Sequence, residues 1–315
     1  MADLSVVIAG LYLENPVMLA SGFVFRPDTI RRCAGYGFGA IVPKTLRRHE
    51  TQGHEPPIFA MFEDGGINAV GLSCPGIDNY VPWYEEYAGR IRQKGTPIIF
   101  SVKPEALADM LYVVRRIKPY ASAIELNGSC PNVPGGMQLC QSPQLIREGV
   151  DAIKQEIGDM LLLFKESPNA DVVGPAHAAK AAGAGATVLI NTVLKSPKDP
   201  DTGWPLTSYG SGGVSGKPIL EKGLQCVRAL YESGIGTPII GCGGISGWQD
   251  MVKYFRAGAD AVQWGTELFL NTPLELEYGG KKSVKTKVGE ALDGLDGFME
   301  DYGSFREFLG RCRHG

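Results

Sequence analysis

The 315-residue sequence has no Cys-x-x-Cys pair and no long apolar run. Its seven cysteines are scattered singly, which argues against a disulfide framework, a zinc site and a self-contained iron–sulfur cluster. No apolar stretch reaches the length of a membrane span, and the first residues lack the basic and apolar regions of a signal peptide. We therefore expect a cytoplasmic protein with no membrane partner and no metal.

An excess of charge of either sign is also missing. The chain has 31 Lys and Arg against 34 Asp and Glu, which gives a net charge of -3 and a pI of about 5.9. This balance gives no electrostatic reason to bind nucleic acid. The hydrophobic fraction of 44% allows a large core, and no Pro-, Gly- and Ser-rich segment divides the chain. We expect a single domain over residues 1–315.

Eight short apolar runs alternate with longer amphipathic segments along the chain. The runs are Val17–Ala20, Ala40–Pro43, Pro97–Val102, Ala123–Leu126, Leu161–Lys165, Thr187–Asn191, Pro238–Gly241 and Ala261–Trp264. The helical patterns that follow them are Pro27–Tyr36, Tyr80–Lys94, Pro104–Ile117, Pro143–Ile157, Val172–Ala182, Pro218–Ser233 and Gly247–Ala257. Runs of this kind are typical of parallel strands buried on both faces, and eight such units close a barrel.

The predicted fold is therefore α/β, a (β/α)8 TIM barrel with an N-terminal hairpin and a C-terminal helical tail. An open doubly wound sheet is the alternative. The hairpin is expected at Leu4–Ile8 and Leu11–Leu13, and the tail helices at Val284–Leu292 and Gly297–Leu309. Two further segments, Glu50–Pro75 and Lys195–Gly213, are expected to be loops.

In a barrel the active face lies at the C-terminal ends of the strands, so the polar residues that follow the apolar runs should converge. Three glycine-rich segments fall there: Gly212–Gly216, Gly241–Ile245 and Gly265-Thr266. Loops after the last two strands of a barrel commonly bind phosphate through backbone N–H groups. The three segments in this order indicate a phosphate site, although glycines of ordinary tight turns remain the alternative.

Lysines and amides also close several of the runs. Lys44 and Lys165 end two runs and could neutralise a ligand charge, although a lysine at such a position can also be a surface residue. Asn127 and Asn191 end two further runs. Because an amide both donates and accepts, these residues suit a planar ligand with alternating C=O and N–H edges. Turn-forming asparagine is the alternative.

One thiol lies among these polar residues. Cys130 follows Asn127 and stands between Ser129 and Pro131, at the expected active face. It could be a packed cysteine, a nucleophile or a general base. The four histidines lie elsewhere in the sequence, so a Cys–His hydrolase is not supported, and no role is assigned to Cys74, Cys140 or Cys242.

Taken together, these motifs resemble the dihydroorotate dehydrogenases, in particular the soluble class 1 enzymes, over nearly the whole chain. The segments that carry the resemblance are Asn15–Gly22, Lys44-Thr45, Asn68–Leu72, Glu125–Val133, Ile190–Thr192, Gly212–Gly216 and Pro238–Ile245. The resemblance implies an FMN-containing barrel that oxidises dihydroorotate to orotate in pyrimidine synthesis. It also implies that Cys130 is the general base that removes the C5 proton, while the C6 hydrogen passes as hydride to flavin N5.

The same resemblance assigns residues to each ligand. Those assigned to FMN are Ser21, Lys44, Thr45, Ser101, Asn127, Lys165, Ile190, Gly216, Gly243, Gly244, Gly265 and Thr266. Those assigned to the substrate are Lys44, Asn68, Ala69, Val70, Gly71, Leu72, Asn127, Asn132, Asn191 and Thr192. Lys165 is expected on the N1/O2 side of the flavin, where a fixed cation stabilises the reduced form.

The chain departs from the family pattern at Cys74, Ser101, Glu166 and the segment Lys195–Gly213. The electron acceptor therefore stays open between fumarate, quinone, and NAD reached through a second subunit that carries FAD and an iron–sulfur cluster. A homodimer is implied by the family. The alternatives in function are a dihydropyrimidine dehydrogenase-like flavin reductase, a flavin-free barrel isomerase or lyase acting on a sugar phosphate, and a flavin-binding subunit without chemistry of its own.

Overall fold

The computed structural model describes residues 2–103, 105–128, 142–169, 171–270 and 282–314. Eight parallel strands form the central sheet, and they follow one another around it in chain order. They are β3 (Val17–Leu19), β4 (Ala40–Ile41), β9 (Ile99–Val102), β10 (Ala123–Asn127), β11 (Leu161–Lys165), β12 (Ala186–Leu189), β15 (Ile239–Cys242) and β16 (Ala261–Trp264). All eight predicted apolar runs are strands of this sheet.

The sheet closes into a barrel through contacts between β4 and β9. Ile41 forms a parallel bridge with Ile98, and its amide donates to the carbonyl of Pro97 at 2.9 Å. A second bridge joins Leu46 to Val102. These contacts join β4 to β9, so the predicted (β/α)8 barrel is confirmed and the open doubly wound sheet is excluded.

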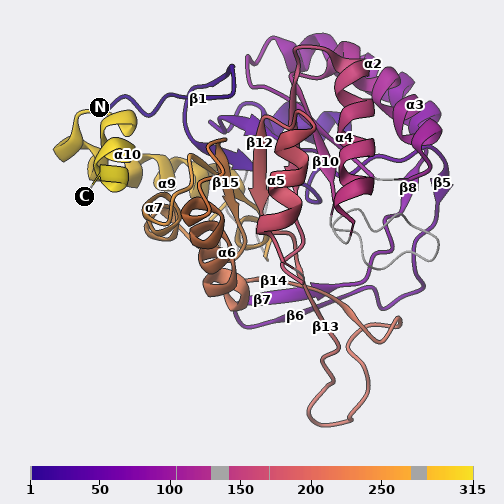
Figure 1. Cartoon of the computed structure of the whole chain (residues 1–315). Coiled ribbons are helices and arrows are strands. Elements are labelled where there is room, and N and C mark those ends of the chain that lie inside the picture. The colour runs from indigo at the N-terminus through magenta and orange to yellow at the C-terminus, as the bar shows by residue number, and fades with distance from the viewer. Residues whose placement is uncertain (1, 104, 129–141, 170, 271–281, 315) are drawn as a thin grey trace.

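Helices follow the strands and cover the outside of the barrel (Figure 1). They are α1 (Pro27–Cys33), α2 (Ile77–Arg92), α3 (Leu107–Ile117), α4 (Pro143–Ile157), α5 (Val173–Ala181), α6 (Leu220–Glu232), α7 (Trp248–Arg256) and α8 (Thr266–Phe269). Short 3-10 helices at Lys118–Tyr120, Lys217–Ile219 and Glu300–Tyr302 join or extend them. Among the described residues, no helix is both long enough and apolar enough to cross a membrane.

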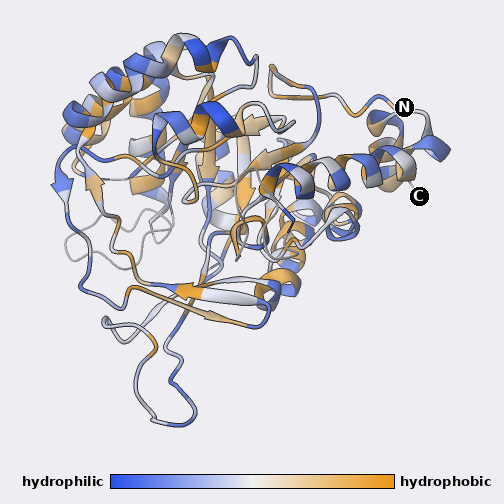
Figure 2. Cartoon of the chain, turned by 180° about the vertical axis from the view of Figure 1, so that it is seen from behind, coloured by the Kyte–Doolittle hydropathy of each residue, from blue (hydrophilic) through white to orange (hydrophobic). Residues whose placement is uncertain are grey.

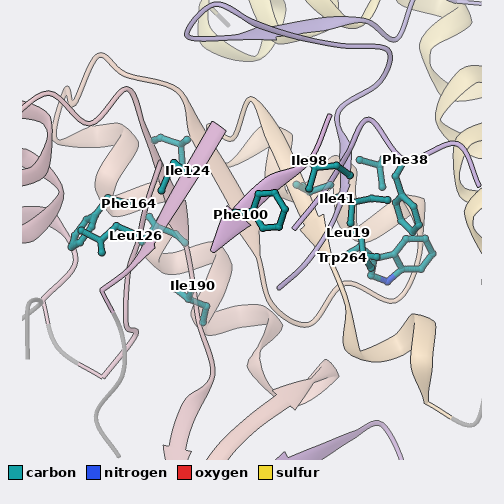
Figure 3. Close-up of a cluster of buried hydrophobic side chains, with 14 of the residues drawn as sticks. Leu19, Phe38, Ile41, Ile98, Phe100, Ile124, Leu126, Phe164, Ile190 and Trp264 are labelled. Atoms are coloured by element: carbon teal, nitrogen blue, oxygen red, sulfur yellow. The ribbon is translucent and has the colours of Figure 1, made fainter. Parts of the chain in front are cut away.

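Alternate residues of each strand enter two different cores. Ile124 and Leu126 of β10 point outward and pack beneath the helices with Phe100 and Phe164, as Figure 3 shows. Ala123 of the same strand belongs to a second cluster inside the barrel. Because every strand is buried on both faces, its sequence reads as a continuous apolar run, which is why these runs were recognisable.

The N-terminal hairpin and the C-terminal helices lie away from the open end of the barrel. Strands β1 (Val6–Ile8) and β2 (Leu11–Leu13) pair in antiparallel fashion, and Ile8 and Leu13 join the cluster inside the barrel. Helices α9 (Val284–Met299) and α10 (Phe305–His314) form the tail, beside the N-terminus (Figure 1). Both predicted features are present, but the boundary predicted between the tail helices was wrong, since α9 continues to Met299.

A separate antiparallel sheet was not predicted. It has the order β13 (Val193–Lys195), β14 (Gly212–Gly216), β7 (Gly65–Asn68) and β6 (Phe59–Phe62), and it lies across the C-terminal ends of the barrel strands. A further short pair joins β5 (Glu50–Thr51) to β8 (Cys74–Pro75). The prediction of a plain loop over Glu50–Pro75 was therefore wrong. The glycine-rich segment Gly212–Gly216 forms strand β14 of the antiparallel sheet.

The segment between β13 and β14, residues 196–211, extends away from the barrel beyond this sheet (Figures 1 and 2). We call this segment the excursion. Trp204 in this segment is 74% exposed. Tyr209, on the returning arm, stacks on the ring of His54 with a centroid separation of 4.2 Å. This contact joins the excursion to the segment that precedes β6.

Candidate active site

A pocket of about 500 Å³ opens between the C-terminal ends of the barrel strands and the antiparallel sheet. Its wall contains most of the residues that the sequence indicated: Ser21, Lys44, Thr45, Asn68, Ala69, Val70, Gly71, Leu72, Asn127, Lys165, Ile190, Asn191, Thr192, Gly216, Gly243, Gly244, Gly265 and Thr266. The size and the mixed lining are typical of a site for a cofactor and a small substrate. What each residue binds stays a prediction.

A chain of hydrogen bonds holds the amides at one side of the pocket. Asn191 donates through Nδ2 to Oδ1 of Asn127 at 3.2 Å, and Asn127 donates through its own Nδ2 to Oγ1 of Thr45 at 3.1 Å. The hydroxyls of Thr45 and Ser101 lie 3.0 Å apart. Ser101 is fully buried and is not part of the pocket wall, so it supports Thr45 from behind.

A second side of the pocket is formed by the segment from Asn68 to Leu72. Asn68, at the end of β7, donates through Nδ2 to the carbonyl of Gly213 on β14 at 3.3 Å. Gly71 and Leu72 both have positive φ, and a Cβ on Gly71 would lie 2.8 Å from Cδ2 of His54. The backbone here follows a path that a larger residue at position 71 would obstruct.

Lys44 reaches the pocket beside this segment. Its ammonium donates to Oγ of Ser73 at 3.0 Å. Burial lowers the pKa of Lys44, and attraction from Cys74 opposes this effect. Cys74 is thus a neighbour of a pocket lysine, which the sequence did not indicate.

The innermost charge in the pocket wall is Lys165, which is 3% exposed. Its Nζ donates to Oε1 of Gln263 at 2.7 Å and lies 3.9 Å from Sγ of Cys242. Burial lowers the pKa of Lys165, but attraction from Cys242 and Glu125 outweighs it, so the pKa is raised above its ordinary value. Lys165 is a fixed cation on the inner side of the pocket.

Two turns that contain glycine bring backbone without a covering side chain to the pocket wall. Gly243 and Gly244 both have positive φ, and a Cβ on Gly244 would lie 2.5 Å from the backbone of Leu220. Gly265 and Thr266 follow β16 nearby in the wall. Main-chain N–H groups that no side chain shields are suited to an anion such as a phosphate.

Several wall residues were missed from the sequence. Phe23 and Phe269 stack with ring centroids 4.9 Å apart and give one apolar wall. Gln263 lies inside a run that was read only as core, and Cys242 lies in the glycine-rich segment Gly241–Ile245 but was given no role. His54 lies in the segment Glu50–Pro75, which was expected to be a loop. Strand alternation was the available signal for two of them, since Cys242 and Gln263 share the inward-facing parity of their strands.

Two predicted residues, Cys130 and Asn132, lie outside the described residues, and so does Cys140. Among the described cysteines, five are free: Cys33, Cys74, Cys226, Cys242 and Cys312. Within the same part of the chain, no group of three or more His, Cys, Asp or Glu side chains could hold a metal ion.

Comparison with known proteins gives a consistent result. A family model described as dihydroorotate dehydrogenase matches residues 3–277. A protein of Thermoplasma acidophilum is 39% identical over 273 residues, which cover 85% of this chain and 88% of that protein. Proteins of Bacteroides thetaiotaomicron and Pyrococcus abyssi are 35% and 33% identical over 317 residues, with at least 98% of both chains covered. All three are named dihydroorotate dehydrogenase B (NAD(+)), catalytic subunit.

Proposed function

The chain belongs to the dihydroorotate dehydrogenase family, and we propose that it oxidises dihydroorotate to orotate in pyrimidine biosynthesis with FMN as its cofactor. The observation that carries this proposal is the composition of the wall of the pocket at the barrel mouth. It combines amides, two lysines and two glycine-rich turns at the C-terminal end of a closed barrel. A flavin and a small cyclic imide together need these groups.

The pocket residues fit FMN. The stacked pair of Phe23 and Phe269 is an apolar surface for a planar ring system. The buried ammonium of Lys165 would be unfavourable facing an apolar ligand, and it suits the polar edge of a flavin. Gly243 and Gly244 would hold the phosphate. When bound, FMN supplies the acceptor for the two electrons that leave the substrate.

The substrate would lie between the amide chain and the segment 68–72. Asn127, fixed by Asn191 and Thr45, would present an oriented amide to the ring. Asn68, Asn132 and Lys44 would complete the recognition of imide and carboxylate. Cys130 would take the C5 proton as general base, since an oxidation that removes two hydrogens needs an acceptor for the one that leaves as a proton.

The partner of this chain is inferred from its relatives. The three relatives described above are named as catalytic subunits of an NAD(+)-linked dihydroorotate dehydrogenase. We infer that this chain likewise passes electrons to NAD through a second subunit with FAD and an iron–sulfur cluster. The described residues contain no ligand set for such a cluster. A homodimer of the catalytic chain would form the centre of the assembly.

Steady-state assays separate this function from its alternatives. Purified protein with bound FMN should turn over dihydroorotate and not dihydrouracil, and isolated protein should use NAD poorly until the second subunit is added. Turnover of dihydrouracil alone would favour the dihydropyrimidine reductase. Absence of a flavin, with activity on a sugar phosphate, would favour the isomerase or lyase.

The role of Cys130 has its own test. The variant Cys130→Ser should keep FMN and reduce flavin far more slowly at neutral pH, because an unassisted serine is a much weaker base. Cys312→Ser, which changes a partly exposed cysteine outside the pocket wall, is the matched control. A parental rate in Cys130→Ser would remove this residue from the mechanism.

A further inference from the structure

A buried polar layer crosses the inside of the barrel directly behind the pocket. Glu125 on β10 is 0% exposed and Gln263 on β16 is 1% exposed. Gln263 donates through Nε2 to Oε2 of Glu125 at 2.7 Å and accepts through Oε1 from Nζ of Lys165, also at 2.7 Å. Three strands of the barrel are therefore joined by one hydrogen-bonded chain that ends at the pocket.

The groups at its two ends determine the direction of the hydrogen bonds in this chain. A carboxylate can only accept hydrogen bonds and an ammonium can only donate them. Gln263 must therefore turn its NH2 group toward Glu125 and its carbonyl toward Lys165.

Glu125 also supplies charge. In the described part of the chain, the titratable groups that act on Lys165 are Cys242 from β15 and Glu125 from β10. Burial raises the pKa of the Cys242 thiol, so this group is protonated at neutral pH. Glu125 is thus the carboxyl group in this hydrogen-bonded chain that can balance the buried ammonium.

A carboxyl group at position 125 is energetically unfavourable in this buried environment. Oε1 of Glu125 has no hydrogen-bond partner among the described residues. Buried polar atoms without a partner are rare, and an apolar side chain would fill this position of the barrel core more favourably. The presence of an acid at position 125 therefore calls for a reason other than packing.

We propose that Glu125 is a positioning residue, which acts through Gln263 to hold Lys165 cationic and aimed into the pocket. The proposal rests on the proposed function for the identity of the ligand that Lys165 faces, the polar edge of FMN. Glu125 itself touches neither ligand; it determines the charge and direction of the residue that does.

The test follows the protonation of Lys165 directly. The variants are Glu125→Gln, which keeps the shape and removes the charge, Gln263→Leu, which breaks the chain, and the double variant. Lysines labelled with carbon-13 at Cε are titrated by NMR in flavin-bound and flavin-free protein, and Lys165→Met identifies the signal. The reduction potential of bound FMN is measured against pH in the same set.

In the parent, Lys165 should stay protonated past its ordinary pKa of 10.5. Glu125→Gln should lower that pKa by about one pH unit or more, equivalent to a tenfold weaker hold on the proton. A matching break in the plot of potential against pH should appear, and should be absent from Lys165→Met. Glu125→Gln should have a smaller effect in the Gln263→Leu background than alone, because the connecting amide is gone.

An unchanged Lys165 titration in folded Glu125→Gln would overturn the proposal. If that variant does not fold, Gln263→Leu decides the matter in the same way, since it too should lower the pKa of Lys165. If the parent binds no FMN, the proposed function fails, yet the titration of flavin-free protein still tests the role of Glu125. If Glu125 had only a structural role, its substitution would change the stability of the protein but not the pKa of Lys165.

Discussion

Asn191, which follows strand β12, donates a hydrogen bond to Asn127 at the end of strand β10, 64 residues away in the sequence. Asn127 passes the interaction on to Thr45, which follows a third strand, β4. Each amide is thereby held in one orientation, which isolated loop asparagines would not be. This preorganisation is what a site needs in order to recognise the edges of a planar ring.

Replacement of Asn127 by Leu should remove both hydrogen bonds at similar side-chain volume. We expect unfolding to become easier by about 1–3 kcal/mol, because buried partners lose their bonds, and orotate to bind at least about tenfold more weakly. Chemical denaturation and orotate titration of the flavin spectrum measure the two effects. Asn79→Leu, on the exposed face of α2, is the control and should leave orotate binding unchanged.

The turn at Gly244 should not tolerate a side chain. Gly244→Ala would place a Cβ 2.5 Å from the backbone of Leu220 at a φ of +74°, so the turn must shift and FMN should be lost. Gly95→Ala is the matched control, with a φ of +76° but open space around the added atom. It should cost about 1 kcal/mol of stability and keep FMN. Retention of FMN at parental affinity in Gly244→Ala would contradict the phosphate role of this turn.

Cys242 offers a chemical probe of cofactor binding. Its thiol lies in the pocket wall, so FMN should protect it from a small alkylating reagent at alkaline pH. Cys312, outside the wall and partly exposed, should react equally with and without FMN. Peptide mapping by mass spectrometry distinguishes the two sites. Equal modification of Cys242 in both states would place FMN elsewhere.

Asp250 should make the protein sensitive to acid. Burial raises its pKa, but hydrogen bonds from Lys253, Ser246 and Lys217 outweigh this and lower the pKa from 3.8 to about 2. The stabilisation is therefore present above pH 4 and is lost as the pH falls from about 4 to 2. Because both lysines are about half exposed, we expect only about 1 kcal/mol.

The variant Asp250→Asn tests this directly. At neutral pH the free energy of unfolding of this variant, measured by urea denaturation, should be lower than that of the parent by about 1 kcal/mol. The difference between the two proteins should shrink as the pH is lowered from 4 toward 2. A difference that is constant over this range would mean that the charge of Asp250 contributes nothing.

The barrel strands could be read from the sequence because each is buried on both faces. Leu161–Lys165 was predicted to the residue, and Lys165 closes it as the sequence indicated. The antiparallel sheet could not be read in this way. Its strands β7 and β14 are rich in glycine, and they pair across 145 residues between Asn68 and Gly213, so neither composition nor local pattern reveals them.

The candidate site likewise contains some residues that could be predicted from the sequence and others that could not. Residues that end a strand, such as Asn127, were recognised because a polar group after an apolar run is conspicuous. Gln263 was not, because it lies within the run Ala261–Trp264 and only the alternation of the strand places it inside the barrel. His54 required tertiary structure, since the excursion and the antiparallel sheet together bring it to the pocket.

Anaerobic mixing of the FMN-bound protein with dihydroorotate is the most direct test of the proposed function. We predict that the visible absorbance of the flavin bleaches and that orotate forms in an amount equal to the reduced flavin. Dihydrouracil at the same concentration should leave the band in place. The account is contradicted if dihydroorotate leaves the flavin oxidised while dithionite reduces it fully.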